Sequence, residues 1–229
     1  MRRDAYFYPL TEIRVSATIR PNSRFCCEEG LVIEVKRRKD VAQIKKDIVR
    51  NTKELFAQKG YGATSMEDIC TINNRSKGSI YYHFKSKEEL FMYLIKLNNE
   101  DWMDEWLEKE PQYKTAIEKL YGLADHYVDD MANPLNHAIN EFVSGQVVSQ
   151  EMMDEMLSLI RIPYATYERI LSEGIEAGEF KKGDPQDMMH IIYGLLSGLS
   201  TLYFEKDMHE IRRLYHMGIS SLLTGIQQR

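Results

Sequence analysis

A short segment, Ser76–Phe84, combines residue types that bind nucleic acid. It begins with small and basic side chains, which can approach phosphates closely. It continues with three large hydrogen-bonding side chains, Tyr81–His83, which helical spacing places on the outer surface, within reach of a DNA groove. The residues that project from polar faces, and that we predict to contact DNA, are Lys77, Tyr82, His83 and Lys87.

A second short helix is predicted immediately before this segment. Ser65 is a typical helix-capping residue, and the carboxylates of Glu67 and Asp68 follow in the positive first turn. A polar turn falls near Asn73 and Asn74. The apolar residues at helical spacing are Met66, Ile69 and Ile72. Two short helices with a polar turn between them are the layout of a helix-turn-helix DNA reader.

Longer helices are predicted on both sides of this motif. The first runs from Asp40 to Lys59 and is ended by Gly60. The other begins at Ser86, with acidic residues behind the cap and an apolar face. The alternative for Tyr81 and Phe84 is that both only pack against these helices. The packing partners would be Phe56 and Leu90.

The distribution of charge supports a nucleic-acid partner although the formal net charge is −5. Residues 36–87 contain 13 Lys and Arg against 5 Asp and Glu, whereas residues 88–229 contain 12 against 25. A basic end attracts phosphate and an acidic end is repelled by it, so the two ends would orient the molecule on DNA. The basic excess coincides with the predicted helix-turn-helix.

This region closely resembles the N-terminal domain of TetR-type repressors. The family's Phe-x-x-x-Gly-Tyr-x-x-Thr pattern is present as Phe56, Gly60, Tyr61 and Thr64. The match continues through Ile69, Ser76, Lys77, Gly78, Tyr81, Tyr82, Phe84, Lys85, Lys87 and Leu90. The resemblance implies an all-α protein. Residues 36–87 would form an N-terminal three-helix helix-turn-helix domain, and residues 88–229 a larger C-terminal helical ligand-binding and dimerisation domain.

The same resemblance implies a double-stranded DNA operator as partner. The basic run Lys36–Lys39 lies where family members carry an arm that touches the DNA backbone. The residues that we assign to DNA binding are Lys36, Arg37, Thr64, Arg75, Ser76, Lys77, Gly78, Tyr81, Tyr82, His83 and Lys87.

Residues 1–35 differ from the rest of the chain. An alternation over Ile13–Ile19 is β-like, and the segment shows no helical period and no signal-peptide pattern. The resembling family normally begins near Lys36. Residues 1–35 are therefore interpreted as an atypical extension, with three alternatives: a disordered extension, an arm of variable use, or an upstream translation start that the cell does not use. We expect the segment to be dispensable.

The remainder of the chain is predicted to be helical, with breaks at Pro111, Asn133–Pro134, Ser149, Gly178 and Lys182–Pro185. The last two helices carry apolar stripes, and Gly194 and Gly198 would permit close helix packing. In TetR-type proteins such a pair joins its copy in a four-helix dimer interface, although burial within one monomer fits the pattern too. We expect a homodimer, because one recognition helix reads only one half-site.

A narrower resemblance, to the multidrug-binding QacR branch, concerns the ligand. It includes the pair Trp102 and Trp106 and the segments Pro134–Phe142 and Glu173–Phe180. In that branch an aromatic and acidic pocket accepts lipophilic cations, and ligand displaces the fourth helix so that the operator is lost. The positions that fall where pocket residues do are Trp102, Asp130, Asn136, Ile139 and Tyr167. Asn98, Asn99, Asn133 and Pro163 depart from the branch's carboxylates and tyrosines, which weakens the expectation of a cation.

Structural alternatives exist for three of the assigned ligand residues. Trp102 and Trp106 lie one turn apart and suit a core, and Asp130 suits a helix cap. Glu141 lies on an apolar face and needs a partner. We assign it to the small-molecule inducer site, with an Arg or Lys of the body as the alternative partner.

The sequence contains no nucleophile elbow, P-loop, dinucleotide fingerprint or HExxH pair. We therefore predict no catalytic residue, metal ligand or cofactor, and regard a helical enzyme as the least favoured alternative. A ligand-independent architectural DNA-binding protein is the other one. Three cysteines without a CxxC spacing indicate a reducing compartment, the cytoplasm, and no apolar stretch is long enough for a membrane span.

Overall fold

The computed structural model describes the backbone of residues 26–145 and 150–226, and the side chains of residues 40–145 and 151–225. The chain divides into two units, Met1–Gln43 and Ile44–Arg229. The predicted alternation at Ile13–Ile19 and the predicted break at Ser149 lie outside the described residues. Side-chain contacts below all belong to the second unit.

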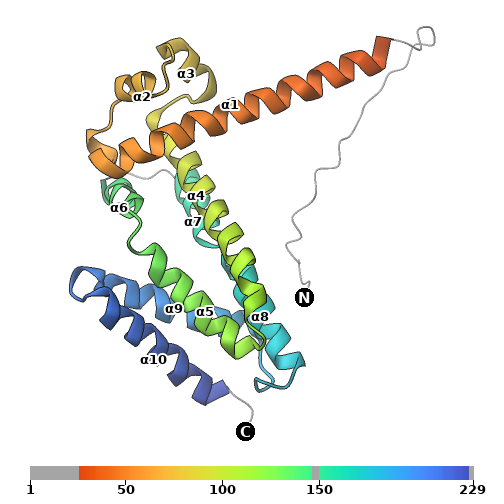
Figure 1. The fold of residues 1–229 in the computed structure, drawn as a ribbon, viewed down its shortest axis with the longest axis vertical. Coiled ribbons are helices and arrows are strands. Elements are labelled where there is room, and N and C mark those ends of the chain that lie inside the picture. Colours follow the sequence, from red (N-terminus) through yellow and green to blue (C-terminus); the bar gives the residue numbers. More distant parts are fainter. Residues whose placement is uncertain (1–25, 146–149, 227–229) are drawn as a thin grey trace. The chain divides into compact units, whose positions relative to one another are not determined.

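The described residues form ten α-helices and two short 3-10 helices, and they contain no β-strand (Figure 1). The elements are α1 (Cys26–Ala63), α2 (Met66–Ile72), α3 (Lys77–His83), α4 (Lys87–Lys109), η1 (Glu110–Gln112), α5 (Ala116–Asp130), α6 (Leu135–Gly145), α7 (Gln150–Ile160), α8 (Tyr164–Glu176), α9 (Pro185–Ser200), η2 (Thr201–Phe204) and α10 (Met208–Ile226). The prediction of an all-α protein is confirmed. Within the described ranges, every helix is too short or too polar to span a bilayer.

Helix α1 departs from its predicted bounds at both ends. It begins at Cys26 instead of Asp40, so part of the segment predicted to lack helical structure is helical. The physical reason is composition, because three Glu, two Lys and two Arg among residues 26–39 favour a helix. Gly60 interrupts α1 with φ 79° and ψ 171°, a conformation that suits glycine. The predicted break is therefore present, although helical residues continue to Ala63.

Local capping explains why the helix-turn-helix forms where it was predicted. The Ser65 hydroxyl accepts the Asp68 N–H at 3.1 Å, and the Asp68 carboxylate accepts the Ser65 N–H at 3.0 Å, which completes a capping box. The Ser76 hydroxyl accepts the Ser79 N–H and the Ser86 hydroxyl accepts the Glu89 N–H, so these residues cap α3 and α4 through the side chain alone. Asn74, at φ 49°, makes the turn between α2 and α3.

Most predicted breaks in the remainder of the chain are confirmed. Pro111 lies in η1, Pro134 separates α5 from α6, and Gly178, at φ 75°, follows α8. Asp184 caps α9. The break between α7 and α8 was not predicted, although Pro163 marks it.

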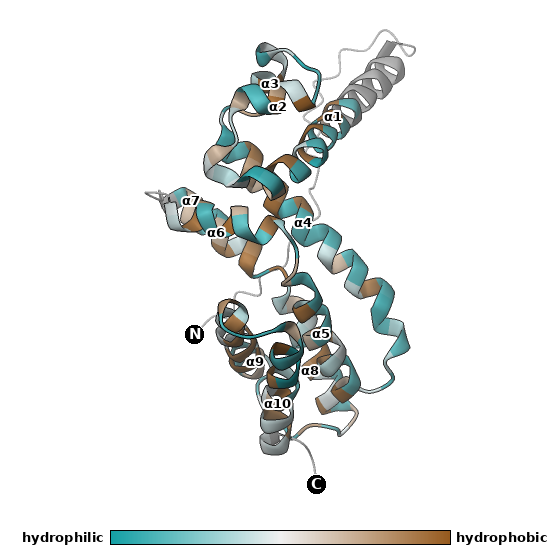
Figure 2. Cartoon of the chain, turned by 60° about the vertical axis from the view of Figure 1, so that its left-hand side comes forward, coloured by the Kyte–Doolittle hydropathy of each residue, from teal (hydrophilic) through white to brown (hydrophobic). Residues whose placement is uncertain are grey.

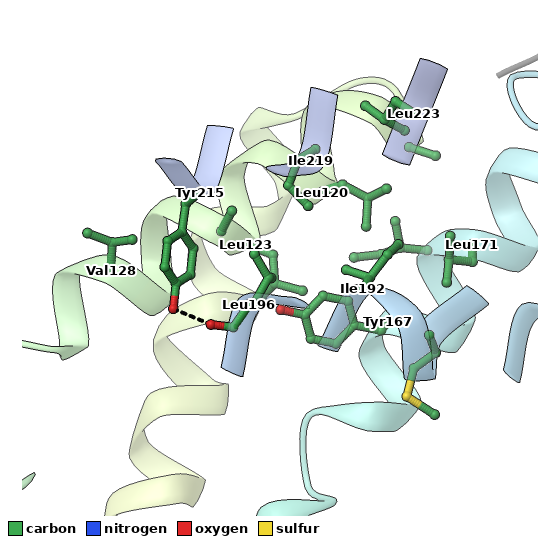
Figure 3. Packing of buried hydrophobic residues seen from close by; sticks show 14 of the residues in the cluster. Leu120, Leu123, Val128, Tyr167, Leu171, Ile192, Leu196, Tyr215, Ile219 and Leu223 are labelled. Atoms are coloured by element: carbon green, nitrogen blue, oxygen red, sulfur yellow. Dashed lines mark hydrogen bonds between the residues drawn. The ribbon is translucent and has the colours of Figure 1, made fainter. Parts of the chain in front are cut away.

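Two apolar clusters organise the second unit. The head cluster joins α1, α2 and α3 to the first half of α4 and to α6, through residues that include Phe56, Ile69, Ile80, Phe91 and Phe142. The body cluster joins the end of α4 to α5, α8, α9 and α10, and Figure 3 shows part of it. Helix α6 therefore packs with the helix-turn-helix. Apolar residues recur along α9 and α10 (Figure 2).

Candidate DNA-binding surface and ligand pocket

Helix α3 presents aromatic side chains to solvent. Ile80 and Phe84 are fully buried and anchor the helix, whereas Tyr81 is 42% and Tyr82 76% exposed. The Tyr82 and His83 rings meet edge to face at 5.1 Å. The pKa of His83 is lowered by burial and by nearby cations, so its imidazole is neutral near pH 7 and can both donate and accept a hydrogen bond.

Two lysines assigned to DNA binding have different partners in the structure. The Lys77 ammonium pairs with Glu67 at 2.8 Å, and both side chains are exposed. Such a pair is weak and can open when a phosphate competes for the lysine. The Lys87 ammonium instead donates to the carbonyls of Tyr61 and Thr64, both at 2.9 Å, and lies 4.2 Å from the centroid of the Tyr61 ring. It stabilises the turn between α1 and α2.

Among the other predicted DNA residues, some form hydrogen bonds within the protein and others are accessible to solvent. Thr64 is 1% exposed and its hydroxyl donates to the Gly60 carbonyl at 2.7 Å, while Ser76 caps α3. Arg75 is partly exposed at the turn before α3. A Cβ atom added at Gly78 would meet nothing within 4 Å, so packing does not require glycine there. The side chains of Lys36 and Arg37 lie outside the described residues.

A cavity of about 280 Å³ lies where α4 and α5 meet the loop before α6. It brings together two of the predicted ligand residues, Trp102 and Asp130. The complete lining is Trp102, Glu105, Lys109, His126, Asp129, Asp130, Ala132 and Asn133. The cavity is thus aromatic on one side and largely acidic on the other.

His126 fixes the aromatic side of the cavity. Its ring stacks on Trp102, with centroids 4.5 Å apart and planes 26° apart. Lys109 Nζ lies 3.1 Å from Nδ1, and the Trp102 carbonyl lies 2.9 Å from Nε2. Because an ammonium group only donates, Nδ1 is the acceptor and the proton resides on Nε2. Burial lowers the pKa of His126, which therefore stays neutral.

Asp130 forms the acidic side, next to the loop that leads into α6. Burial raises the pKa of its carboxyl group, which accepts a hydrogen bond from the Asn133 amide at 3.0 Å. The Asn133 side chain also accepts the Leu135 N–H at 3.1 Å and so caps α6. The predicted ligand residue Asn136 does not line the cavity, because its amide donates to the Asp130 carbonyl at 2.8 Å.

Tyr167, another predicted ligand residue, is fully buried in the body cluster with Ile192 and Leu196 (Figure 3). Within the described part of the chain, its hydroxyl group is one of two buried side-chain polar atoms without a hydrogen-bond partner. The Tyr215 hydroxyl, in contrast, donates to the Leu196 carbonyl at 2.6 Å. Tyr127 is close to both the cavity and Tyr167. Its ring centroid lies 6.3 Å from that of Trp102, and its charge contributes, after burial, to the raised pKa of Tyr167.

The last two predicted ligand residues lie with the helix-turn-helix instead of the cavity. Ile139 packs against the head cluster. The Glu141 carboxylate accepts the Gly62 N–H at 3.0 Å. Its predicted alternative partner, a Lys or Arg of the body, is not found among the described ion pairs, in which Glu141 meets only His137, at 3.5 Å.

Several lining residues were not assigned from the sequence. Glu105 and Lys109 follow Trp102 at spacings of one and two helical turns, so they share its face of α4. His126 and Asp130 are likewise one turn apart on α5. This helical spacing could have identified these residues as cavity lining from the sequence. Within the described residues, no group of three or more His, Cys, Asp or Glu side chains is placed to hold a metal ion.

Comparisons with known proteins were consistent over nearly the whole of the second unit. Residues 48–94 match the family model of bacterial regulatory proteins of the tetR family. Residues 98–228 match the model of the C-terminal region of QacR-like proteins. The chain is 28% identical over 186 residues to the HTH-type transcriptional regulator QacR of Staphylococcus aureus strain Mu50, covering 81% of this chain and 99% of that protein.

Solved structures show the same fold. The regulator FadR from Bacillus subtilis, in complex with stearoyl-CoA, superimposes with a TM-score of 0.64 and 22% identity, over 79% of this chain and 98% of that one. A regulator from Saccharomonospora viridis, in complex with choline, gives a TM-score of 0.67 and 18% identity, over 82% of this chain and all (100%) of that one.

Proposed function

The chain belongs to the TetR family of bacterial regulatory proteins, and we propose that it is a transcriptional repressor that a small lipophilic ligand releases from its DNA operator. The exposed outer face of α3 carries this proposal. A tyrosine that is 76% exposed has no packing role to explain it, and Gly78 leaves room for a close approach by a phosphate.

We assign direct DNA contact to the open positions of this surface, Lys77, Gly78, Tyr81, Tyr82 and His83, with Arg75 beside them. Thr64, Ser76 and Lys87 contribute by holding the helices in place. The protein would act in the cytoplasm, where its operator lies.

The DNA assignment can be tested with a duplex selected from a library of palindromic sequences. Lys77→Ala combined with Tyr82→Ala should abolish operator binding in fluorescence anisotropy at fixed salt. Lys114→Ala, which removes one exposed lysine near η1 and α5, is the matched control and should leave affinity within about two-fold. If the double variant binds as wild type does, the DNA surface lies elsewhere.

For the inducer, we propose a small cation that carries an aromatic or aliphatic group. An indole face attracts a cation, and a buried carboxylate neutralises it. The cavity holds Trp102 and the half-buried carboxylate of Asp130, with Glu105 and Asp129 beside them, at a volume of about 280 Å³, close to the lower end for small-molecule sites. The unpartnered Tyr167 hydroxyl offers a hydrogen bond to a longer ligand that passes Tyr127.

A quaternary ammonium probe, benzyltrimethylammonium, and its uncharged tert-butyl isostere separate the contributions of charge and shape. In a Trp106→Phe background, the cation should quench Trp102 fluorescence and release operator over the same concentration range. Asp130→Asn should weaken the cation by about 2 kcal/mol and the isostere far less. Asp104→Asn, which removes an exposed carboxylate from α4, is the control. Operator release without quenching would place the inducer outside this cavity.

Operator binding by this fold also requires two recognition helices, so we propose a homodimer formed through α9 and α10. Ile191 is 59% and Met217 52% exposed on these helices. A Cβ atom at Gly194 or Gly198 would meet nothing within 4 Å. An open apolar face with two glycines suits close packing against a second copy.

A further inference from the structure

Helix α6 contacts the turn between α1 and α2 through two adjacent side chains. The Phe142 ring packs edge to face on Tyr61, with centroids 4.8 Å apart, and lies 5.2 Å from Phe91. Glu141 precedes it and extends a carboxylate over the backbone of the same turn. This end of α6 therefore offers an apolar and an ionic contact to one short segment.

The contact between Glu141 and the turn is close and specific. Its Oε2 accepts the Gly62 N–H at 3.0 Å. A Cβ atom built at Gly60 would lie 2.6 Å from Oε2 and 2.8 Å from Oε1, so a side chain at that position would displace the carboxylate. Gly60 also has φ +79°, which other residues rarely adopt. Glycine at position 60 thus serves both the backbone conformation and the approach of Glu141.

Two side chains of opposite charge hold the turn, a cation at its carbonyl groups and an anion at one of its N–H groups. The Lys87 ammonium donates hydrogen bonds to the carbonyls of Tyr61 and Thr64, while the Glu141 carboxylate accepts one from the Gly62 N–H. The break at Gly60 leaves these groups without the regular pairing of a continuous helix. The half-buried Lys87 and the more exposed Glu141 supply the partners instead. Ser65, which caps α2, follows directly.

We infer that Glu141 is a positioning residue for the helix-turn-helix: its carboxylate, bound to the Gly62 N–H and packed against Gly60, sets the turn from which α2 and α3 begin. Its role is to support operator binding from within the protein, and it is no part of the ligand cavity. This inference rests on the proposed DNA-binding function.

The sign of the effect distinguishes positioning from simple electrostatics. Removal of a negative charge from a DNA-binding protein strengthens attraction to phosphate. If Glu141 acts only as a charge, its loss tightens operator binding. If it positions the helix-turn-helix, its loss weakens binding. Glu155→Ala, which removes an exposed carboxylate from α7, measures the purely electrostatic effect.

The experiment uses the full chain and three variants, Glu141→Ala, Glu141→Gln and Glu155→Ala. Operator affinity is measured by anisotropy at fixed salt, well below each melting temperature. Glu141→Ala should lose about five-fold or more in operator affinity. This loss corresponds to less free energy than a hydrogen bond to a charged group usually contributes. Glu141→Gln keeps an acceptor oxygen and should lie between Glu141→Ala and wild type. Glu155→Ala should bind as wild type does or slightly more tightly.

The contact itself is read from the Gly62 amide in ¹⁵N NMR spectra. Its proton resonance should shift and its hydrogen exchange should accelerate in Glu141→Ala, but not in Glu155→Ala. As a second reading, Gly60→Ala should lower the melting temperature more in wild type than in the Glu141→Ala background, because the second variant has no carboxylate to displace.

The outcomes separate this inference from the proposed function. If wild type binds no selected duplex, the repressor proposal fails, and the Gly62 amide still tests the contact. If wild type binds and Glu141→Ala binds equally well or more tightly, the positioning role is overturned. An unmoved Gly62 resonance in Glu141→Ala overturns it as well.

Discussion

The ion-pair network around Glu110 should make a measurable contribution to stability. The Glu110 side chain is 10% exposed and accepts Arg169 Nη1 at 2.8 Å and Nη2 at 2.6 Å, and Lys119 Nζ lies 3.1 Å away. These contacts tie η1 to α5 and α8, the helices that carry much of the body cluster. We predict that Glu110→Gln destabilises the protein.

The magnitude follows from what the substitution leaves behind. Glutamine keeps one acceptor oxygen but turns an NH2 group toward a guanidinium that only donates. Arg169 and Lys119 retain Glu173, at 2.8 and 2.6 Å, so neither cation is left without a partner. The loss is therefore about one charge-assisted hydrogen bond, about 2 kcal/mol. In a chain of this length that lowers the melting temperature by about 4–8 °C.

The effect should depend on pH with a defined sign. The hydrogen bonds from Arg169 hold the pKa of Glu110 below its ordinary value of 4.5. The folded state therefore prefers the ionised carboxylate. The stabilisation is complete above pH 4.5 and disappears as the pH falls through the lowered pKa of the folded state. The gap in melting temperature between wild type and Glu110→Gln should be widest near pH 7 and should narrow below pH 4.5.

Differential scanning calorimetry at pH 7 and pH 3.5, at one protein concentration, measures both the loss of melting temperature in Glu110→Gln and its decrease in acid. Glu108→Gln removes an exposed carboxylate from the last turn of α4, two residues before Glu110, and should cost at most about 0.5 kcal/mol. Equal melting temperatures for the two variants at pH 7, or a gap that does not narrow in acid, would refute the reasoning.

Three further predictions follow from single contacts. In urea denaturation, Tyr215→Phe should lower the free energy of unfolding by about 1 kcal/mol, because it removes a buried hydrogen-bond donor. Tyr167→Phe should leave that free energy unchanged or raise it, because the Tyr167 hydroxyl lacks a partner, and equal losses for the two variants would contradict this reasoning. Ile191→Glu should give a monomer in sedimentation, whereas Met153→Glu, on α7, should not, and dimers of both would place the interface elsewhere. Burial raises the pKa of Asp130 above its ordinary value of 3.8, so affinity for benzyltrimethylammonium should begin to fall at a higher pH than for an ordinary aspartate as the solution is acidified. Asp130→Asn should remove that loss in a titration of affinity against pH, and a loss retained in the variant would assign it to another group.

The parts of the fold that were predicted correctly are those that depend on residues close in sequence. Ser65 and Asp68 complete their capping box across three residues, and Gly60 breaks α1 through its own backbone angles. Such signals require no knowledge of the tertiary structure. The start of α1 was predicted wrongly because the Glu, Lys and Arg residues before Asp40 favour a helix by propensity, whereas the prediction relied on apolar periodicity.

The candidate sites were predicted less completely, because their partners are distant in sequence. Trp102 and Asp130 do line one cavity, yet the residue that stacks on the indole is His126, on another helix. No local pattern identifies that pairing. The periodicity of α4 and α5 would have found further lining residues once one member of each helix was accepted.

Lys87 and Glu141 have partners within the protein that charge and position in the sequence do not reveal. We predicted DNA as the partner of Lys87 because its side chain projects from a polar face of the motif, and a ligand as the partner of Glu141 because a carboxylate on an apolar face needs a partner. In the structure, both bind backbone groups of the turn that begins at Gly60. A glycine break within a helix frees carbonyl and N–H groups that must be satisfied. Charged residues that reach such a break should therefore be considered as its partners before they are assigned to a ligand.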